Sequence, residues 1–124
     1  MILLTLALLC ADNFHLQYAA EHAGLPPERV VAIASVETRC NLSPRVRGRA
    51  GEWGRFQIRV STARRRCPGL NIRRYRGNVA CFLVMFGQDV RRFGVTDATV
   101  RHNGYGPAGA YAFLYKVLKV EEVR

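Results

Sequence analysis

The chain has 124 residues, 49% of them hydrophobic, which is enough for one domain with a core of its own. Its formal net charge is +10, with arginine supplying 17 of the 19 basic residues, so it favours an anionic partner such as nucleic acid or an acidic polymer, or else forms a solvated basic surface. The sequence contains no transmembrane span, repeat, low-complexity tract or phosphate-binding glycine motif, which excludes the classes of protein that depend on them.

The first predicted element is the apolar N-terminal segment, residues 1–13, whose apolar run is too short to cross a bilayer. It fits a secretory signal poorly, because no basic residue precedes the run and leucine occupies a cleavage position that needs a small residue. We therefore expect a retained first helix or packing segment, with a poor signal sequence as the alternative. The next helix is predicted between Asn13 and a stop at Gly24, with three residues facing the core: Phe14, Tyr18 and Ala19.

A third helix is predicted to begin at Pro27, since proline suits the first turn of a helix. Four of its residues share one face at helical spacing: Val30, Ile33, Ala34 and Glu37. The acid has two interpretations. It ends the apolar stripe and turns to water, as most glutamates do. Alternatively, apolar neighbours favour its protonated form, and the retained proton then serves in general-acid catalysis.

A basic loop punctuated by glycines follows this helix over residues 45–54, after Pro44 has broken the helical geometry. It holds the single tryptophan, Trp53, which we expect to be either a lid on the core or a platform for stacking. The motif Arg55-Phe56-Gln57-Ile58 comes directly after the loop. The only strand pattern is a small hairpin around residues 48–58.

Four more helices complete the predicted order. A short one is capped by Ser61 and runs to Arg66, carrying its charge outward. A strongly amphipathic one runs from about Asn78 to a stop at Gly94. Its core stripe is Val79, Phe82, Leu83, Phe86, Val90 and Phe93. A third is capped by Thr96 or Asp97 and runs to His102, and the last begins at Pro107 with Tyr111, Leu114, Tyr115 and Leu118 on one side.

The four cysteines are Cys10, Cys40, Cys67 and Cys81. They contain no C-x-x-C pair and have no histidine placed to complete a zinc site, so we expect no metal. In an exported protein they would form two disulfides, with three possible pairings. In a protein assembled in the cytosol they would remain buried thiols, because cysteine packs as a small hydrophobe. Both interpretations stay open at the level of sequence.

The order of these motifs resembles the lysozyme-like lytic transglycosylase domain, a relative of goose-type lysozyme, over roughly residues 14–120. The matching residues are Glu37-Thr38, Ser43-Pro44, Gly51, Gly54-Arg55-Phe56-Gln57-Ile58, Arg101-His102-Asn103-Gly104 with Gly106-Pro107, and Tyr115-Lys116-Val117-Leu118. The resemblance implies a mainly α, lysozyme-like helical domain with at most a small β-hairpin near the active-site loop, followed by a tail of residues 121–124. The chain departs from the family pattern at Thr38, at Arg55-Phe56 and at His102, where the family has serine, Leu-Met and tyrosine. We expect Arg55 to reshape the groove or to add a charged contact to murein.

The resemblance also implies a function, that of a peptidoglycan lytic transglycosylase that cuts the MurNAc-GlcNAc β-1,4 bond. Glu37 would be its catalytic general acid and base, and no cofactor would be needed. The substrate-binding residues implied by the family are Thr38, Phe56, Gln57, Asn103 and, from the last helix, Tyr111 or Phe113. The alternative is a hydrolytic muramidase that uses Glu52 as its second carboxylate.

The expected partners are peptidoglycan glycan strands and other proteins of a virion or secretion apparatus. The site of action would be the periplasm, at the bacterial cell envelope, reached by virion delivery or by export. A competing class is a nucleic-acid-binding module, with the arginines of residues 45–49, 64–66 and 73–76 on phosphates. That class gives no reason for an acid on the apolar face of a helix, so we expect no specific nucleic acid.

Overall fold

The computed structural model describes residues 10–103 and 107–123, so the expectation for the first nine residues lies outside it. The helices of the described chain are α2 (Asn13–His22), α3 (Pro27–Thr38), α4 (Val60–Arg66), α5 (Tyr75–Phe93), α6 (Val95–Asn103) and α7 (Pro107–Val123). No strand occurs in these two ranges, where Trp53 makes isolated antiparallel bridges to Arg47 and Ile58. The prediction of a mainly α fold is therefore confirmed. None of the described helices is both long and apolar enough to cross a membrane.

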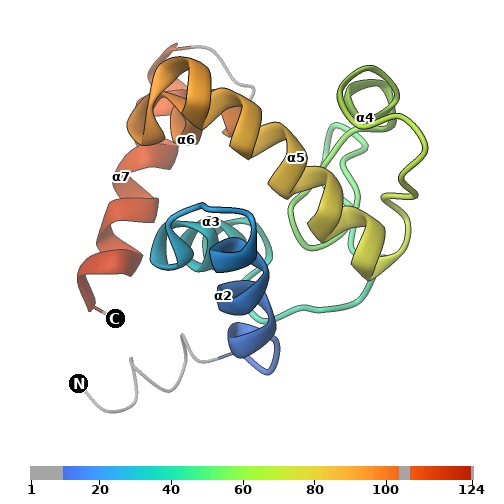
Figure 1. Ribbon diagram of the computed structural model, residues 1–124, viewed down its shortest axis with the longest axis horizontal. Coiled ribbons are helices and arrows are strands. Elements are labelled where there is room, and N and C mark those ends of the chain that lie inside the picture. Colours follow the sequence, from blue (N-terminus) through green and yellow to red (C-terminus); the bar gives the residue numbers. More distant parts are fainter. Residues whose placement is uncertain (1–9, 104–106, 124) are drawn as a thin grey trace.

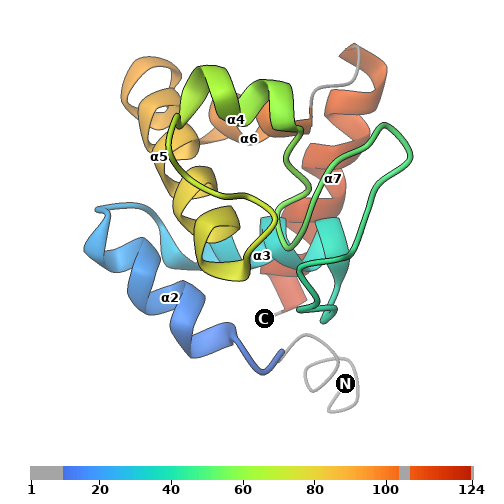
Figure 2. The same cartoon turned by 90° about the vertical axis from the view of Figure 1, so that its right-hand side faces the viewer.

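Helix α3 forms the centre of the molecule, and Figures 1 and 2 show the other helices arranged around it. It packs against α2 and α7, while α6 contacts both α5 and α7, and α4 contacts α5. Residues 30–35 of α3 are all buried, so the helix is enclosed on every side along this stretch. Each large side chain buried there contributes about 1.5–3 kcal/mol. The predicted stripe was therefore only part of a helix that is apolar all round.

Helix α5 is the amphipathic helix that the sequence predicts, although it begins three residues earlier, at Tyr75. Val79, Phe82 and Phe86 are buried, whereas the other three residues of the predicted stripe are only partly buried. The ring of Phe82 stacks on Phe86 and also on Phe56 from the loop, with centroids 5.1 and 3.9 Å apart. Gly94 ends the helix with a φ of 89°, a conformation that favours glycine. This part of the core follows directly from the helical period.

The predicted inner face of α2 is wrong. Phe14 and Tyr18 are 87% and 65% exposed, whereas Leu16 and Ala20 are fully buried. Helix α2 packs against α3, and Tyr18 stacks instead on His22 of its own helix, with ring centroids 5.1 Å apart. Hydrophobicity along one helix could not distinguish these two faces.

The predicted inner face of α7 is also wrong. Tyr115 and Leu118 are exposed, and the buried residues are Phe113 and Val117, which face α3 and α6. The side chain of Tyr111 lies outside the described part of the structure. Helix α4 likewise begins at Val60 with no side-chain cap, so the predicted cap at Ser61 is wrong.

All four cysteines form disulfides, Cys10 with Cys40 and Cys67 with Cys81. The first joins the segment before α2 to Cys40, just after the end of α3, across 30 positions of sequence. The second joins the end of α4 to α5. The interpretation as two disulfides is therefore confirmed, and none of the four cysteines is a free thiol.

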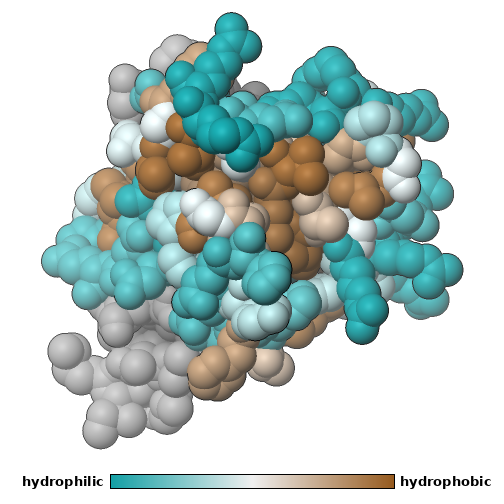
Figure 3. All heavy atoms as spheres, viewed as in Figure 1, coloured by the Kyte–Doolittle hydropathy of each residue, from teal (hydrophilic) through white to brown (hydrophobic). Residues whose placement is uncertain are grey.

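The face seen in Figure 3 carries hydrophobic atoms across its middle, bordered by hydrophilic side chains that project at the top and right. Comparison with Figure 1 places the apolar atoms over α5 and the hydrophilic ones near α4 and α6. Val84 of α5 is 40% exposed on the outer side of its helix. Most arginines of residues 10–103 are exposed.

Candidate functional site

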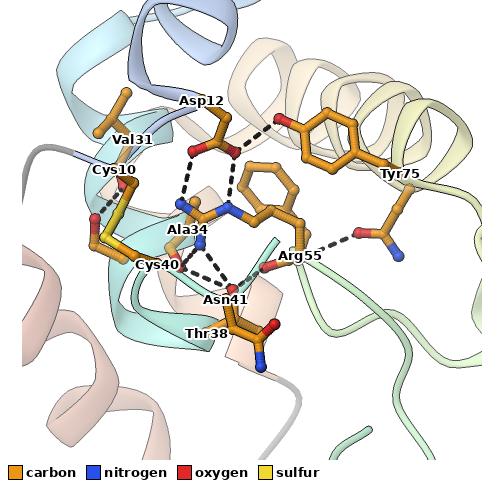
Figure 4. A network of polar contacts seen from close by, with 12 residues as sticks. Cys10, Asp12, Val31, Ala34, Thr38, Cys40, Asn41, Arg55 and Tyr75 are labelled. Atoms are coloured by element: carbon orange, nitrogen blue, oxygen red, sulfur yellow. Dashed lines mark hydrogen bonds and ion pairs between the residues drawn. A yellow bond between two sulfur atoms is a disulfide. The ribbon is translucent and has the colours of Figure 1, made fainter. Parts of the chain in front are cut away.

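Arg55 is buried in the core instead of facing a groove, so the prediction that its charge contacts the substrate is wrong. Its side chain is 1% exposed and binds both carboxylate oxygens of Asp12, at 2.8 and 3.1 Å. The hydroxyl of Tyr75 donates to the same carboxylate at 2.7 Å, as Figure 4 shows. Burial raises the pKa of Asp12, but the hydrogen bonds from Arg55 and Tyr75 outweigh it and hold that pKa below its usual value. Burial and the nearby Asp12 raise the pKa of Tyr75.

The remaining guanidinium nitrogen of Arg55 binds the C-terminal turn of α3. It donates to the carbonyl of Ala34 at 2.9 Å and to the hydroxyl oxygen of Thr38 at 2.8 Å (Figure 4). Thr38 in turn donates to the backbone carbonyl of Arg55 at 2.9 Å. These bonds join the loop residue Arg55 to the last turn of α3. Thr38 therefore holds the helix end, one residue after Glu37, and does not line the cavity described next.

Glu37 lies at the edge of a cavity of about 480 Å³ between α3, the loop before α4, and helices α4 to α6. Its side chain is 18% exposed. A volume of this size is within the range of about 300–1,000 Å³ found for small-ligand sites. Most of the cavity lining is polar or charged: Glu37, Gly48, Arg49, Glu52, Gln57, Ile58, Arg59, Thr62, Arg65, Arg66, Met85, Phe86, Asp89, Ala98, Arg101 and His102. In the described ranges, no three His, Cys, Asp or Glu side chains are grouped to hold a metal ion.

His102 contacts Glu37, and the sequence analysis did not select it as a site residue. Its Nε2 lies 3.1 Å from Oε2 of Glu37 and 3.0 Å from the backbone carbonyl oxygen of Phe56. The ring is 7% exposed and meets Phe82 edge-on, with centroids 4.9 Å apart. The available signal was its position in the segment that resembles a transglycosylase motif, where that family has tyrosine, another hydrogen-bonding residue.

Gln57 lines the same cavity from the loop and has a φ of 52°, which is unusual for a residue other than glycine. Its amide nitrogen donates to the carbonyl of Gly54 at 2.9 Å. A Cβ atom on Gly48 would lie 2.5 Å from the Gln57 amide oxygen and 2.0 Å from a carboxylate oxygen of Glu52. A larger residue at position 48 would therefore displace the ends of these two cavity-lining side chains.

The loop that carries Phe56 and Gln57 is fixed to α5 by Asn78, which is fully buried. The Asn78 side chain accepts a hydrogen bond from the backbone of Phe56 at 2.8 Å and donates to the carbonyls of Trp53 at 2.7 Å and Ile72 at 2.9 Å. A Cβ atom on Gly54 would approach its amide nitrogen to 2.6 Å, so the close contact also requires glycine at position 54. The hydrogen bonds of Asn78 thus hold the loop that carries Gln57 in place against α5.

Glu52, the predicted alternative carboxylate, lies in the same cavity as Glu37. Its side chain is 13% exposed and 3.9 Å from the exposed Arg59. Its Oε1 atom is buried and accepts no hydrogen bond from the described residues. The structure therefore brings together both carboxylates that the sequence analysis selected.

Arginines give the cavity a basic margin. Arg66 is paired with Asp89 at 2.9 Å, and the guanidinium of Arg101 lies 3.6 Å from the ring centre of Phe93. Arg49 and Arg65 also line the cavity and are exposed. An anionic group on a ligand would be attracted to this margin.

Two of the other predicted substrate-binding residues, Phe56 and Phe113, do not line this cavity. Phe56 is 0% exposed and Phe113 is 6% exposed, so their side chains belong to the core, and the Phe113 ring lies 6.2 Å from that of His102. The side chains of Asn103 and Tyr111 lie outside the described part of the structure. Trp53 is partly buried against the core, and the guanidinium of Arg47 lies 3.8 Å from its ring centre. This position fits the interpretation of Trp53 as a lid on the core better than that of an open stacking platform.

Comparisons with protein-family models, with curated proteins and with solved structures found no match to this chain.

Proposed function

We propose that this chain is a peptidoglycan-cleaving glycosidase, most specifically a lytic transglycosylase, with a lysozyme-like fold. The observation that carries the proposal is the position of Glu37. Its carboxylate lies near the end of a helix whose residues 30–35 are all buried, is largely screened from water, and borders a polar cavity of suitable size. A carboxyl group in such a setting is a reasonable general acid.

In the proposed reaction Glu37 first gives its proton to the glycosidic oxygen between MurNAc and GlcNAc as that bond breaks. The C6 hydroxyl of the same MurNAc then attacks its own anomeric carbon and returns a proton to Glu37. The products are a 1,6-anhydro-muramoyl end and a free GlcNAc end, and no water is consumed. One carboxyl group therefore suffices, while the amide of Gln57 in the cavity is suited to N-acetyl and hydroxyl groups.

A hydrolytic muramidase is the second candidate function, and it is favoured by Glu52. This carboxylate lines the same cavity and is mostly buried. As a second carboxylate it would act as a nucleophile or activate a water molecule, which leaves a reducing end on MurNAc. The nature of the product therefore distinguishes the two candidates.

Two further observations support the cellular setting of the proposal. Disulfides form and persist in oxidising compartments, so the two disulfides support a protein that is exported or delivered to the envelope. The basic margin of the cavity suits murein, whose peptides carry carboxylates. Partner proteins of a virion or secretion apparatus belong to the same proposal.

The test is digestion of purified murein, with mass spectrometry of the sugar ends. We expect anhydro ends from the wild type, and for Glu37→Gln a loss of activity of roughly 10²–10⁴-fold. Glu28→Gln is the matched control, because Glu28 is exposed at the other end of the same helix and does not line the cavity. Wild-type clearing by Glu37→Gln would refute the proposal. Reducing ends together with an inactive Glu52→Gln variant would select the muramidase.

A further inference from the structure

One nitrogen atom of His102 lies within hydrogen-bond distance of two acceptors, and this fixes the position of its proton. Nε2 is 3.0 Å from the carbonyl oxygen of Phe56, which can only accept a hydrogen bond. Nε2 must therefore carry a hydrogen. Glu37 Oε2 lies 3.1 Å from Nε2 and is a second acceptor for that hydrogen. Oε2 is thus occupied as an acceptor. The proton that the proposed general acid has to deliver is then favoured on its other oxygen, Oε1.

The groups that hold His102 are themselves rigid. Its ring packs edge-on against Phe82, and the carbonyl that it binds belongs to Phe56, whose ring stacks on Phe82 and whose backbone amide donates to Asn78. His102 is on α6, Phe56 is on the loop and Glu37 is on α3, so this one side chain joins three separate elements. Movement of the Glu37 carboxylate is therefore limited by the core of the molecule.

We propose that His102 is the positioning residue for Glu37. By donating from Nε2 to Oε2 it fixes the carboxyl group, so that Oε1 delivers the proton to the glycosidic oxygen and later takes the proton from the C6 hydroxyl. This inference rests on the proposed function and names the residue that orients its acid. His102 acts through Glu37 and forms or breaks no bond to substrate.

Two variants separate the hydrogen bond from the packing. His102→Phe keeps an aromatic ring against Phe82 and Phe113 but removes the donor, whereas His102→Gln keeps an N–H donor at similar reach. Since a misplacement of about 1 Å can cost roughly 10²-fold in rate, we expect kcat of His102→Phe on soluble murein oligosaccharides to fall roughly 10- to 100-fold, with KM little changed. His102→Gln should recover most of that loss. Thermal unfolding of both variants reports whether packing has been lost as well.

A merely structural role predicts a different pattern. If Phe and Gln at position 102 reduce kcat equally, or if His102→Phe keeps the wild-type kcat, the positioning role is overturned. In addition, His102→Phe should cause no further loss in the Glu37→Gln background, because its effect acts through Glu37. A further loss of the same size in that background would also overturn it.

A spectroscopic measurement keeps this inference separate from the proposed function. Nitrogen NMR of labelled protein should show a hydrogen on Nε2 of His102, with a change in the Nε2 signal in Glu37→Gln. An Nδ1-protonated ring would overturn the inference even if murein is cleaved. Conversely, a chain that leaves murein intact but shows the Nε2–H signal coupled to Glu37 would refute the glycosidase and retain the hydrogen bond.

Discussion

At the scale of single residues, Arg55 shows how a charged side chain becomes part of a core. A guanidinium is costly to bury unless its donors are satisfied. Here Asp12, the carbonyl of Ala34 and the hydroxyl of Thr38 all accept from it. The benefit lies in geometry, because these bonds fix the turn of α3 that carries Glu37.

The Asp12–Arg55 pair predicts a loss of stability in acid. The pKa of Asp12 in the folded protein lies below its ordinary value of 3.8, so folding favours the charged form. Its contribution to the free energy of unfolding is present above that ordinary value and is lost as pH falls through the lower, folded pKa. We expect urea unfolding between about pH 5 and pH 2 to show this decrease.

The matched control for this pH dependence is Asp12→Asn. It should be less stable than the wild type at neutral pH, because Arg55 loses its charged partner within the core. Its stability should also depend less on pH across the acid range. Parallel pH curves for the two proteins would contradict the role given to this carboxylate.

At the scale of elements, the two disulfides hold different parts of the molecule. Cys10–Cys40 joins the chain before α2 to the region just after α3, beside the Arg55 network (Figure 4). Cys67–Cys81 joins α4 to α5, and both helices contribute residues to the cavity wall. Their loops differ in length, with sequence separations of 30 and 14.

Removing the disulfide that closes the longer loop should therefore lower the stability of the fold. We expect Cys10→Ser/Cys40→Ser to lower the free energy of unfolding by about 3–4 kcal/mol, measured by urea titration, because the unfolded chain gains freedom. Cys67→Ser/Cys81→Ser should cost slightly less, since its loop is shorter. The opposite order, or no loss in either variant, would show that the disulfides do not stabilise the fold in this way.

At the scale of the whole molecule, the excess of positive charge suggests capture of an anionic polymer before any chemistry. The net charge is +10, and most arginines of residues 45–49, 64–66 and 73–76 are exposed. Projecting hydrophilic side chains are visible in Figure 3. Exposed charges act over about 8 Å at physiological ionic strength, so added salt weakens their attraction.

We therefore predict that salt separates binding from turnover. Raising the salt concentration should weaken sedimentation of the protein with insoluble murein, while turnover of a short soluble glycan changes much less. A parallel fall in both would contradict this division of roles. Arg64→Gln, on the exposed side of α4 and away from the cavity lining, should shift the salt dependence of binding without changing turnover of the short glycan.

The sequence by itself determined the helices of this protein and the acid selected as its candidate catalytic residue. Helical periodicity, proline at position 27 and glycine at position 94 act through neighbours within about one turn, so they predict α3 and α5 from local pattern alone. The resemblance to the transglycosylase motifs drew attention to Glu37 and Gln57, and the need of a hydrolase for a second carboxylate drew attention to Glu52. The fold places these three side chains around one cavity.

Only the tertiary structure decided which faces are buried and which polar residues meet. The exposed Phe14 and Tyr18 obey the same helical period as the buried Leu16 and Ala20, and the choice depends on the surface of α3 opposite them. Arg55 finds Asp12 across 43 positions of sequence, and His102 finds Glu37 across 65. Whether a charge can be buried, and which tautomer a histidine adopts, depend on partners that the folded chain brings together. No local sequence pattern contains that information.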